Sequence, residues 1–284
     1  MGDPQTLADF ASWAAVNYPA NKYLLVIWNH GGGFRSLSSN LTRDIAWDDT
    51  NGGDKITMPE LESALSAIST QIGKKIDIVG MDACFMAMTE VAYQIKDYVD
   101  ILVSSEESEP SAGWPYNTIL GQLVSSPLMS SGQFAADIVD EYIFSYSGYN
   151  VTQSAIDLSY MDALAGQLSD LALAIMSDSI TPKSKYILAS VGSQYYGDYD
   201  FIDLYDFCNK VLFYSNNSNV KNIALNIQQT INSSIIDFGY SGFGLGGSRG
   251  ISIYFPYIAY HNYYNNTNFS QDTFWDEMLS YLGF

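Results

Sequence analysis

Two residues that could do nucleophilic chemistry stand where apolar runs of the sequence end. Cys84 comes shortly after the run 76–79, and the segment 85–95 behind it has helical spacing. His30 closely follows the apolar run 23–28 and precedes three glycines. In an open α/β sheet such junctions lie at the carboxyl ends of strands, where ligands bind. There Cys84 could act as a nucleophile while His30 moves protons, chiefly to the leaving group.

The expected surroundings of both residues favour this chemistry. A helix beginning directly after Cys84 would favour the thiolate through its N-terminal N–H groups and dipole. The glycines after His30 let backbone N–H groups approach a bound carbonyl, so Gly31 and Cys84 could form an oxyanion hole. Taken singly, Cys84 could instead be a small buried hydrophobe and His30 a buried polar group. Cys84 and Cys208 could also form a disulfide. A catalytic Cys84 must stay reduced, however, and Cys208 is then most simply a core residue.

A serine-esterase interpretation has a literal motif but lacks its context. Residues 246–250 read Gly-Gly-Ser-Arg-Gly, which matches the G-x-S-x-G elbow around Ser248. An elbow needs a strand before the serine and a helix after it, followed by an acid and then a histidine. A strand-like run, 251–255, follows Ser248 instead, and no acid lies between it and His261, the only later histidine. We therefore interpret the match as accidental.

The order of the apolar runs predicts an α/β fold of three layers. Runs that are apolar on both faces are typical of parallel strands between helices, and the crossovers are long enough for parallel pairing. No repeat or composition break divides the chain, so we expect one domain over residues 1–284. The expected strands are 23–28, 76–79, 99–104, 151–158, 235–240 and 251–255. The expected helices are 7–16, 57–71, 85–95, 117–124, 132–144, 161–176, 185–190, 203–213, 220–231 and 274–282, and 34–54 is expected to be an exposed loop.

Composition disfavours several classes of partner. With 284 residues and 47% apolar content, the chain can bury a sizeable core. It holds 12 Lys and Arg against 31 Asp and Glu, and the net charge of −19 disfavours nucleic acid and anionic membranes. No apolar run is long enough for a transmembrane helix, and residues 1–6 lack the basic start of a signal peptide. Six glycosylation sequons weakly favour an exported protein.

The motifs together support a family resemblance. NHGGG follows YLLVIW, DAC follows IDIVGM, and the later stretches are EVAYQIKDYVDILVSSEESEPSAGWPY, SAIDLS, FIDLYDF and GISIYFP. From about Leu7 onward the chain thereby resembles the clostripain-type cysteine peptidases, relatives of caspases, gingipains and legumains. The resemblance implies a caspase-like sandwich with a mostly parallel central sheet flanked by helices. It also implies an endopeptidase for protein or peptide substrates that uses a dyad of Cys84 and His30 and requires no cofactor for the chemistry.

The resemblance further implies a preference for Arg or Lys before the scissile bond. In characterised members an acid two positions before the cysteine contributes to the specificity pocket, and Asp82 occupies that position here. A carboxylate can pair bidentately with a guanidinium. Asp82 could instead cap the helix that follows it. Some relatives carry a further acid just before the glycine of the Gly-Trp-Pro-Tyr loop, where this chain has Ala112, and this departure bears on the preference for basic residues.

Self-cleavage and calcium binding are two more properties that the resemblance suggests. Family members are often activated by self-cleavage in the loop between the histidine and the cysteine, and residues 34–55 offer Arg43 and Lys55, although this segment could simply be a surface loop. Calcium dependence is known in the family. Four acids of the segment could supply oxygen ligands without the spacing of an EF-hand: Asp44, Asp48, Asp49 and Asp54.

Relatives usually have additional strands and a leader ahead of the region that begins at Leu7. We therefore expect this chain to be a fragment or trimmed form of a secreted or cell-envelope protein. The competing class of function is a non-catalytic surface or binding protein on a peptidase-like scaffold, since a fold does not guarantee its function.

Overall fold

The computed structural model describes residues 2–34, 45–48, 50, 52–197 and 199–284. Its strands are β1 (Leu24–Trp28), β2 (Ile45–Asp48), β3 (Asp54–Ile56), β4 (Ile76–Asp82), β5 (Val99–Ser104), β6 (Val151–Asp157), β7 (Tyr195–Tyr196), β8 (Phe201–Asp203), β9 (Ile235–Ser241) and β10 (Ser252–Tyr254). Its α-helices are α1 (Pro4–Asn17), α2 (Met58–Ile72), α3 (Thr89–Ile95), α4 (Tyr116–Ser125), α5 (Ser131–Ser145), α6 (Met161–Met176), α7 (Lys183–Val191), α8 (Leu204–Tyr214), α9 (Ser218–Ser234), α10 (Asn268–Asp272) and α11 (Trp275–Leu282).

The central sheet is mixed and has the strand order β1-β4-β5-β6-β9. Strands β1, β4 and β5 pair in parallel, as their long helical crossovers require, whereas β6 runs antiparallel to both β5 and β9. The parallel half is the part that the apolar runs 23–28, 76–79 and 99–104 predicted. A smaller antiparallel sheet has the order β10-β8-β7, and β2 pairs with β3.

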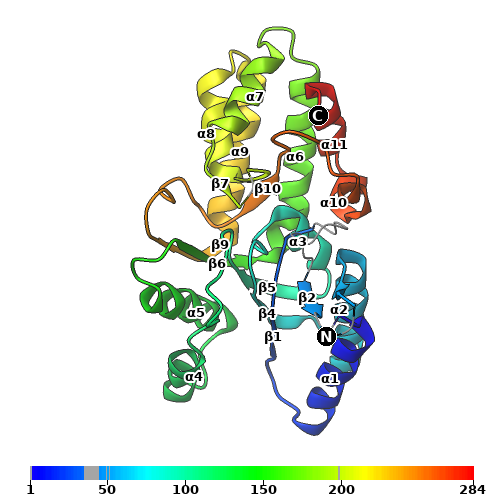
Figure 1. The fold of residues 1–284 in the computed structure, drawn as a ribbon, viewed down its shortest axis with the longest axis vertical. Helices are drawn as coiled ribbons and strands as arrows, with labels where there is room; N and C mark the ends of the chain where they lie inside the picture. The colour runs from blue at the N-terminus through cyan, green and yellow to red at the C-terminus, as the bar shows by residue number, and fades with distance from the viewer. Residues whose placement is uncertain (1, 35–44, 49, 51, 198) are drawn as a thin grey trace.

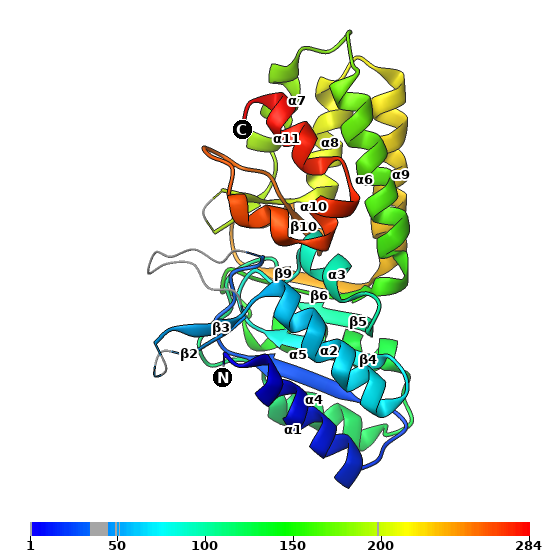
Figure 2. The same ribbon diagram turned by 90° about the vertical axis from the view of Figure 1, so that its right-hand side faces the viewer.

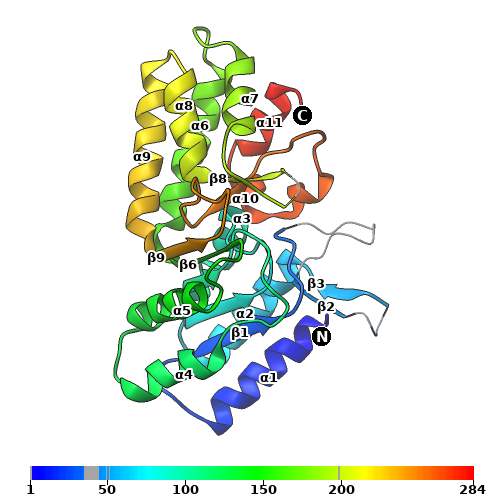
Figure 3. The same ribbon diagram turned by 60° about the vertical axis from the view of Figure 1, so that its left-hand side comes forward.

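Helices cover both faces of the central sheet (Figures 1 and 2). Helices α1 and α2 lie on one face and α4 and α5 on the other. One buried apolar cluster fills the first face and continues among α6, α8, α9 and α11, and a second lies between the sheet and α4 with α5. Figure 3 shows the small sheet between the central sheet and helices α6–α9. This arrangement confirms the expected three-layer α/β fold.

Local sequence signals explain where α2 begins and ends. The Thr57 backbone N–H donates to Glu60 Oε2 at 2.9 Å, and the two residues form the expected capping box. The helix ends at Gly73, whose φ of 73° is the left-handed conformation that glycine adopts without strain. Among the described helices, none is both long and apolar enough to cross a membrane.

The prediction of an exposed loop over residues 34–54 was wrong at Phe34 and over β2, whereas Thr50, Gly52 and Asp54 are exposed. Phe34 is buried and its ring packs against Tyr254 and Tyr264, with ring centroids 4.9 and 5.0 Å away. Ile45 is also buried, in β2. Strand β2 has four residues and pairs only with β3, so it left too short a pattern to recognise. Residues 35–44, 49 and 51 lie outside the described part of the chain.

Candidate active site

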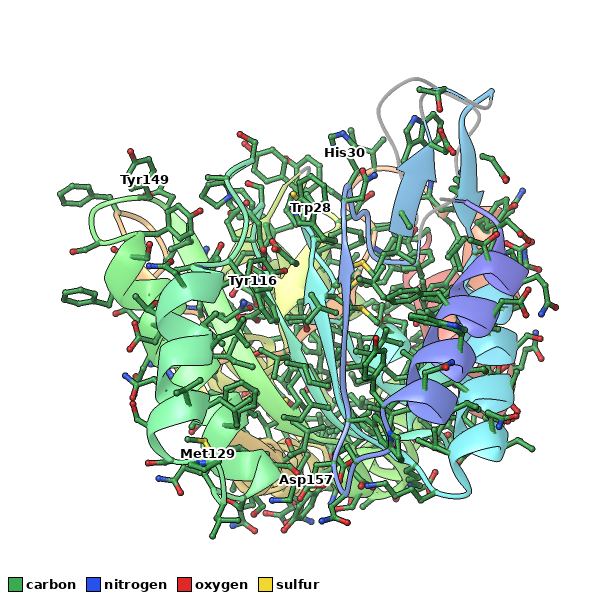
Figure 4. The ribbon with its side chains drawn as sticks, turned by 90° about the horizontal axis from the view of Figure 1, so that it is seen from below. Trp28, His30, Tyr116, Met129, Tyr149 and Asp157 are labelled. Atoms are coloured by element: carbon green, nitrogen blue, oxygen red, sulfur yellow. The ribbon has the colours of Figure 1, made fainter. Side chains whose placement is uncertain are left out.

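The pairing of β1 with β4 brings the two predicted catalytic residues to one edge of the sheet. Trp28 is the register partner of Asp82, and His30 and Cys84 each follow two residues later. All four side chains line a cleft of about 230 Å³. Figure 4 shows Trp28 and His30 at this end of the sheet, with Met129 and Asp157 at the opposite end. The prediction that His30 and Cys84 reach a common cleft from adjacent strand ends is consistent with this geometry.

The backbone of His30 is held by its neighbours. Its N–H donates to Asn29 Oδ1, and its carbonyl accepts a hydrogen bond of 3.2 Å from the N–H of Ala46 in β2. The Asn29 side chain also donates to the carbonyl of Trp47 at 3.0 Å. The β2 strand therefore positions the loop that carries His30, whose side chain is exposed toward the cleft.

The Cys84 sulfur lies among backbone N–H groups. Its Sγ accepts a hydrogen bond of 3.2 Å from the N–H of Glu109. Burial raises the pKa of the Cys84 thiol, and hydrogen bonds from the N–H groups of Glu109, Cys84 itself and Gly31 oppose that increase. Gly31 must be glycine, because a Cβ there would lie 2.4 Å from the carbonyl oxygen of Cys84. The N–H groups of Gly31 and Cys84 thus lie near the sulfur, which is consistent with an oxyanion hole between them.

The expected helix directly after Cys84 was wrong. Helix α3 begins at Thr89, and the N–H groups of Phe85 and Ala87 donate to the carbonyls of Glu107 and Ser105 in the loop after β5. Phe85 has a φ of 60°, an uncommon conformation for a residue other than glycine. The apolar residues 85–88 fit the spacing of a helix, but their backbone N–H groups form hydrogen bonds with the loop after β5. Helix α3 therefore gives no dipole at the sulfur, and backbone N–H groups act in its place.

Asp82 is buried in the wall of the cleft and does not cap a helix. It is 3% exposed, and its Oδ2 accepts hydrogen bonds from the Trp114 N–H at 3.0 Å and the Tyr116 hydroxyl at 2.8 Å. The N-cap of α3 is Met88, which makes no side-chain capping bond. The capping alternative for Asp82 is therefore wrong. Its carboxylate faces the loop that carries Gly113, where a Cβ would lie 2.8 Å from Oδ2.

Glu109 is a site residue that the sequence interpretation missed. Its Oε2 accepts a hydrogen bond of 3.1 Å from the Trp114 indole, and its side chain lines the same cleft as Cys84. Burial, followed by the charge of Asp82, raises the pKa of the Glu109 carboxyl well above its ordinary value. Gly80 makes this arrangement possible, because a Cβ there would lie 2.7 Å from the Trp114 ring. The acidic context before Gly-Trp-Pro-Tyr was the available signal.

The structure places the remaining candidate nucleophiles away from this cleft. Ser248 is buried, and it accepts a hydrogen bond of 2.7 Å from the hydroxyl of Tyr196. A turn precedes it, so the elbow context is absent there. Cys84 and Cys208 are both free thiols, and Cys208 is buried in the core.

The processing and calcium candidates fall partly outside the described residues. Arg43, Asp44 and Asp49 lie in the segments that the structure does not describe. Lys55 lies in β3, with its Nζ 5.7 Å from the centre of the Trp47 ring. Asp48 Oδ1 accepts hydrogen bonds from Thr50, and Asp54 begins β3. Within the described ranges, no three His, Cys, Asp or Glu side chains gather where they could hold a metal ion.

Comparisons with known proteins find a similar curated sequence and similar solved structures. Clostripain from Hathewaya histolytica is 27% identical over 318 residues, which cover 94% of this chain and 60% of that relative. The chain therefore spans less than two thirds of the curated relative's length.

Solved structures share the fold. A secreted C11 cysteine protease from Bacteroides thetaiotaomicron, in complex with an irreversible peptide inhibitor, superimposes with a TM-score of 0.73 at 20% identity, over 97% of this chain and 78% of the other. An inactive zymogen C11 protease from Parabacteroides distasonis gives a TM-score of 0.70 at 19% identity, over 96% and 76%. These likenesses confirm the caspase-like sandwich. The model of the clostripain family matches residues 1–282, and this chain therefore belongs to the clostripain family.

Proposed function

We propose that this protein is a cysteine endopeptidase that uses Cys84 as nucleophile and His30 as proton carrier. The observation that carries the proposal is the shared cleft, in which both side chains stand two residues beyond paired ends of parallel strands. Membership of the clostripain family and the cysteine proteases among the solved relatives support it. A non-catalytic scaffold would not need both groups in one cleft.

The geometry suggests how the reaction would proceed. Cys84 Sγ attacks the scissile carbonyl carbon, and the N–H groups of Gly31 and Cys84 stabilise the negative charge that forms on its oxygen. His30 accepts the thiol proton and donates it to the leaving amine, which yields a thioester. A water molecule then attacks the thioester carbonyl while His30 again handles the proton, and Cys84 is released as a thiol.

Asp82 is the basis for a preference for Arg or Lys before the scissile bond. Its carboxylate lies in the wall of the same cleft, where it can pair with a guanidinium or an ammonium group. The clostripain from Bacteroides thetaiotaomicron was solved with the peptide inhibitor BTN-VLTK-AOMK, whose peptide ends in Lys. This resemblance supports the assignment of Asp82 as the pocket acid.

We also propose that the chain is processed by self-cleavage after Arg43 or Lys55 and that the protein acts outside the cytoplasm. A zymogen and a secreted protease among the solved relatives support these two proposals. Cleavage after Lys55 would require β3 to separate from β2, because this residue lies within the strand. Intact-mass measurement of incubated wild-type and Cys84→Ala protein distinguishes the two positions and shows whether cleavage depends on Cys84.

The test of the proposed function is hydrolysis of matched fluorogenic peptides that differ only in the residue before the scissile bond. Arg, Lys, Asp, Asn and norleucine peptides are compared with and without calcium. We expect turnover of the Arg and Lys peptides, and Cys84→Ala should lose more than about 10⁴-fold in kcat. Turnover of the other peptides alone would overturn the role of Asp82. An absence of turnover, with an intact chain and an unreactive Cys84, would favour the binding scaffold.

A further inference from the structure

The pocket acid Asp82 has a second carboxyl group beside it. We propose that Glu109 is a specificity-determining residue that shares one proton with Asp82 in the empty pocket, and that a substrate Arg or Lys side chain displaces this proton and binds between the two carboxylates. The inference rests on the proposed function. It adds a second acidic residue to the pocket that would bind the Arg or Lys side chain.

The hydrogen bonds of Glu109 leave one of its oxygens available. Oε2 accepts the indole N–H of Trp114, whereas Oε1 is buried and has no hydrogen-bond partner among the described residues. Leaving a buried carboxylate oxygen without a donor is unfavourable, and such atoms in native structures call for an explanation. A proton between Glu109 and Asp82 would satisfy this oxygen in the empty pocket, and a cationic side chain would satisfy it in the occupied one.

Among the residues that the structure describes, the groups around the two carboxyls do not compensate their charge. The described titratable groups in and around the cleft are Cys84 after β4, Glu107 in the loop after β5, His30 after β1, Tyr116 at the start of α4, and Tyr142 and Tyr146 on α5. None of these six residues carries a permanent positive charge. Two neighbouring carboxylates in such surroundings ionise in sequence, because the first negative charge opposes the second. The raised pKa of Glu109 agrees with this.

A bound basic side chain offsets the repulsion between the two carboxylates. With one shared proton the empty pair carries a single negative charge, and on binding the proton leaves to solvent while the cation faces two carboxylates. No covalent bond changes. Since one proton is released for each cation bound, affinity should rise about tenfold per pH unit below the raised pKa of Glu109.

The test measures binding of agmatine, which carries a guanidinium group but no scissile bond. Calorimetry in the Cys84→Ala background removes the titration of the thiol. We expect the dissociation constant of agmatine to fall about tenfold per pH unit over the acidic range in the Cys84→Ala protein, which is the parent of the other variants. In Glu109→Gln it should be nearly independent of pH, because the amide can still accept from Trp114 and donate to Asp82 but has no proton to release. At high pH this variant should bind agmatine about 10- to 100-fold more weakly.

Three comparisons make the test specific. Glu107→Gln removes one negative charge from the same loop and should keep the parental pH dependence of agmatine binding. Glu109→Asp keeps a carboxyl group at position 109 and should show this pH dependence too. In the enzyme with Cys84 intact, Glu109→Gln should raise KM for Arg peptides while kcat changes little. Equal slopes in the parent and Glu109→Gln would overturn the inference while leaving the role of Asp82 intact. A failure of the parent to bind agmatine at any pH would overturn the inference, and the peptide panel then shows whether the basic preference or the peptidase itself is wrong.

Discussion

At the scale of single residues, the free enzyme should hold Cys84 mainly as a thiol. Burial raises the pKa of this group above its ordinary value, which lowers the thiolate fraction at neutral pH. We therefore predict that alkylation of Cys84 by iodoacetamide accelerates with pH to above pH 9. Rates measured by mass spectrometry across pH 5–10 would check this. A plateau reached below pH 7 would instead indicate a thiolate that already exists beside a charged His30.

The site residues differ in how far the sequence could predict them. His30 and Cys84 were predicted because each closely follows an apolar strand, and strand ends of a parallel sheet meet at one edge. Asp82 was predicted only from the resemblance to the clostripain-type peptidases. Glu109 stands in an irregular loop, and its carboxylate accepts a hydrogen bond from the indole of Trp114, which packs on Gly80. No periodicity records such a contact, and the acidic stretch before Gly-Trp-Pro-Tyr was the only signal for it in the sequence.

At the scale of elements, strand β2 should contribute to catalysis by fixing the loop of His30. We predict that Asn29→Ala lowers kcat about 5- to 10-fold with little change in KM, because it removes hydrogen bonds to the His30 N–H and the Trp47 carbonyl. Steady-state kinetics with an Arg peptide check this. Asn29→Asp keeps the acceptor for His30 and should lose less. Equal losses in the two variants would show that this acceptor does not matter.

The elements also show where sequence patterns succeed. Long segments with clear periodicity, such as α6 and the strand Val99–Ser104, were predicted with their observed bounds. The start of α3 was missed because apolar residues 85–88 bond to the loop after β5 rather than to a helix. Local patterns do not encode partners that are distant in the sequence. The start of α3 and the capping alternative for Asp82 were wrong for this reason.

At the scale of the whole molecule, a second buried acid pair links the central sheet to the C-terminal helices. Glu106 follows β5 and accepts from the Gly250 N–H at 3.0 Å. Asp203 ends β8 and caps α8, where it accepts from the Asp206 N–H at 2.6 Å. The two carboxyls are near enough for each to affect the pKa of the other. Burial raises the pKa of Asp203 to about 7 and that of Glu106 well above its usual value.

This pair should make the fold less stable as the pH rises. Unfolded carboxyls titrate near about pH 4, so the folded protein keeps protons that the unfolded chain has released. The free energy of unfolding therefore falls as pH increases from about 4 through 7. We predict that the thermal midpoint falls by several degrees between pH 5 and 8, and that Glu106→Gln reduces this loss. Buried Glu90, whose pKa is raised to about 7, and Glu109, whose pKa is also raised, should add to this loss.

Thermal unfolding followed by circular dichroism at several pH values checks this prediction. Asp170→Asn, at an exposed position of α6, serves as the control and should follow the wild type. A midpoint that rises between pH 5 and 8 in the wild type, or an unchanged pH dependence in Glu106→Gln, would show that this pair does not hold a proton.

The most direct test of the central claim is the covalent labelling of Cys84 by a peptidyl chloromethyl ketone that ends in Arg. The protein is incubated with this reagent or with its norleucine counterpart, and the adduct is located by peptide mass mapping. We predict one adduct, on Cys84, that forms much faster with the Arg reagent and slows at least about tenfold in Asp82→Asn. Slow labelling that does not distinguish the two reagents, or an adduct elsewhere in the chain, would contradict the account.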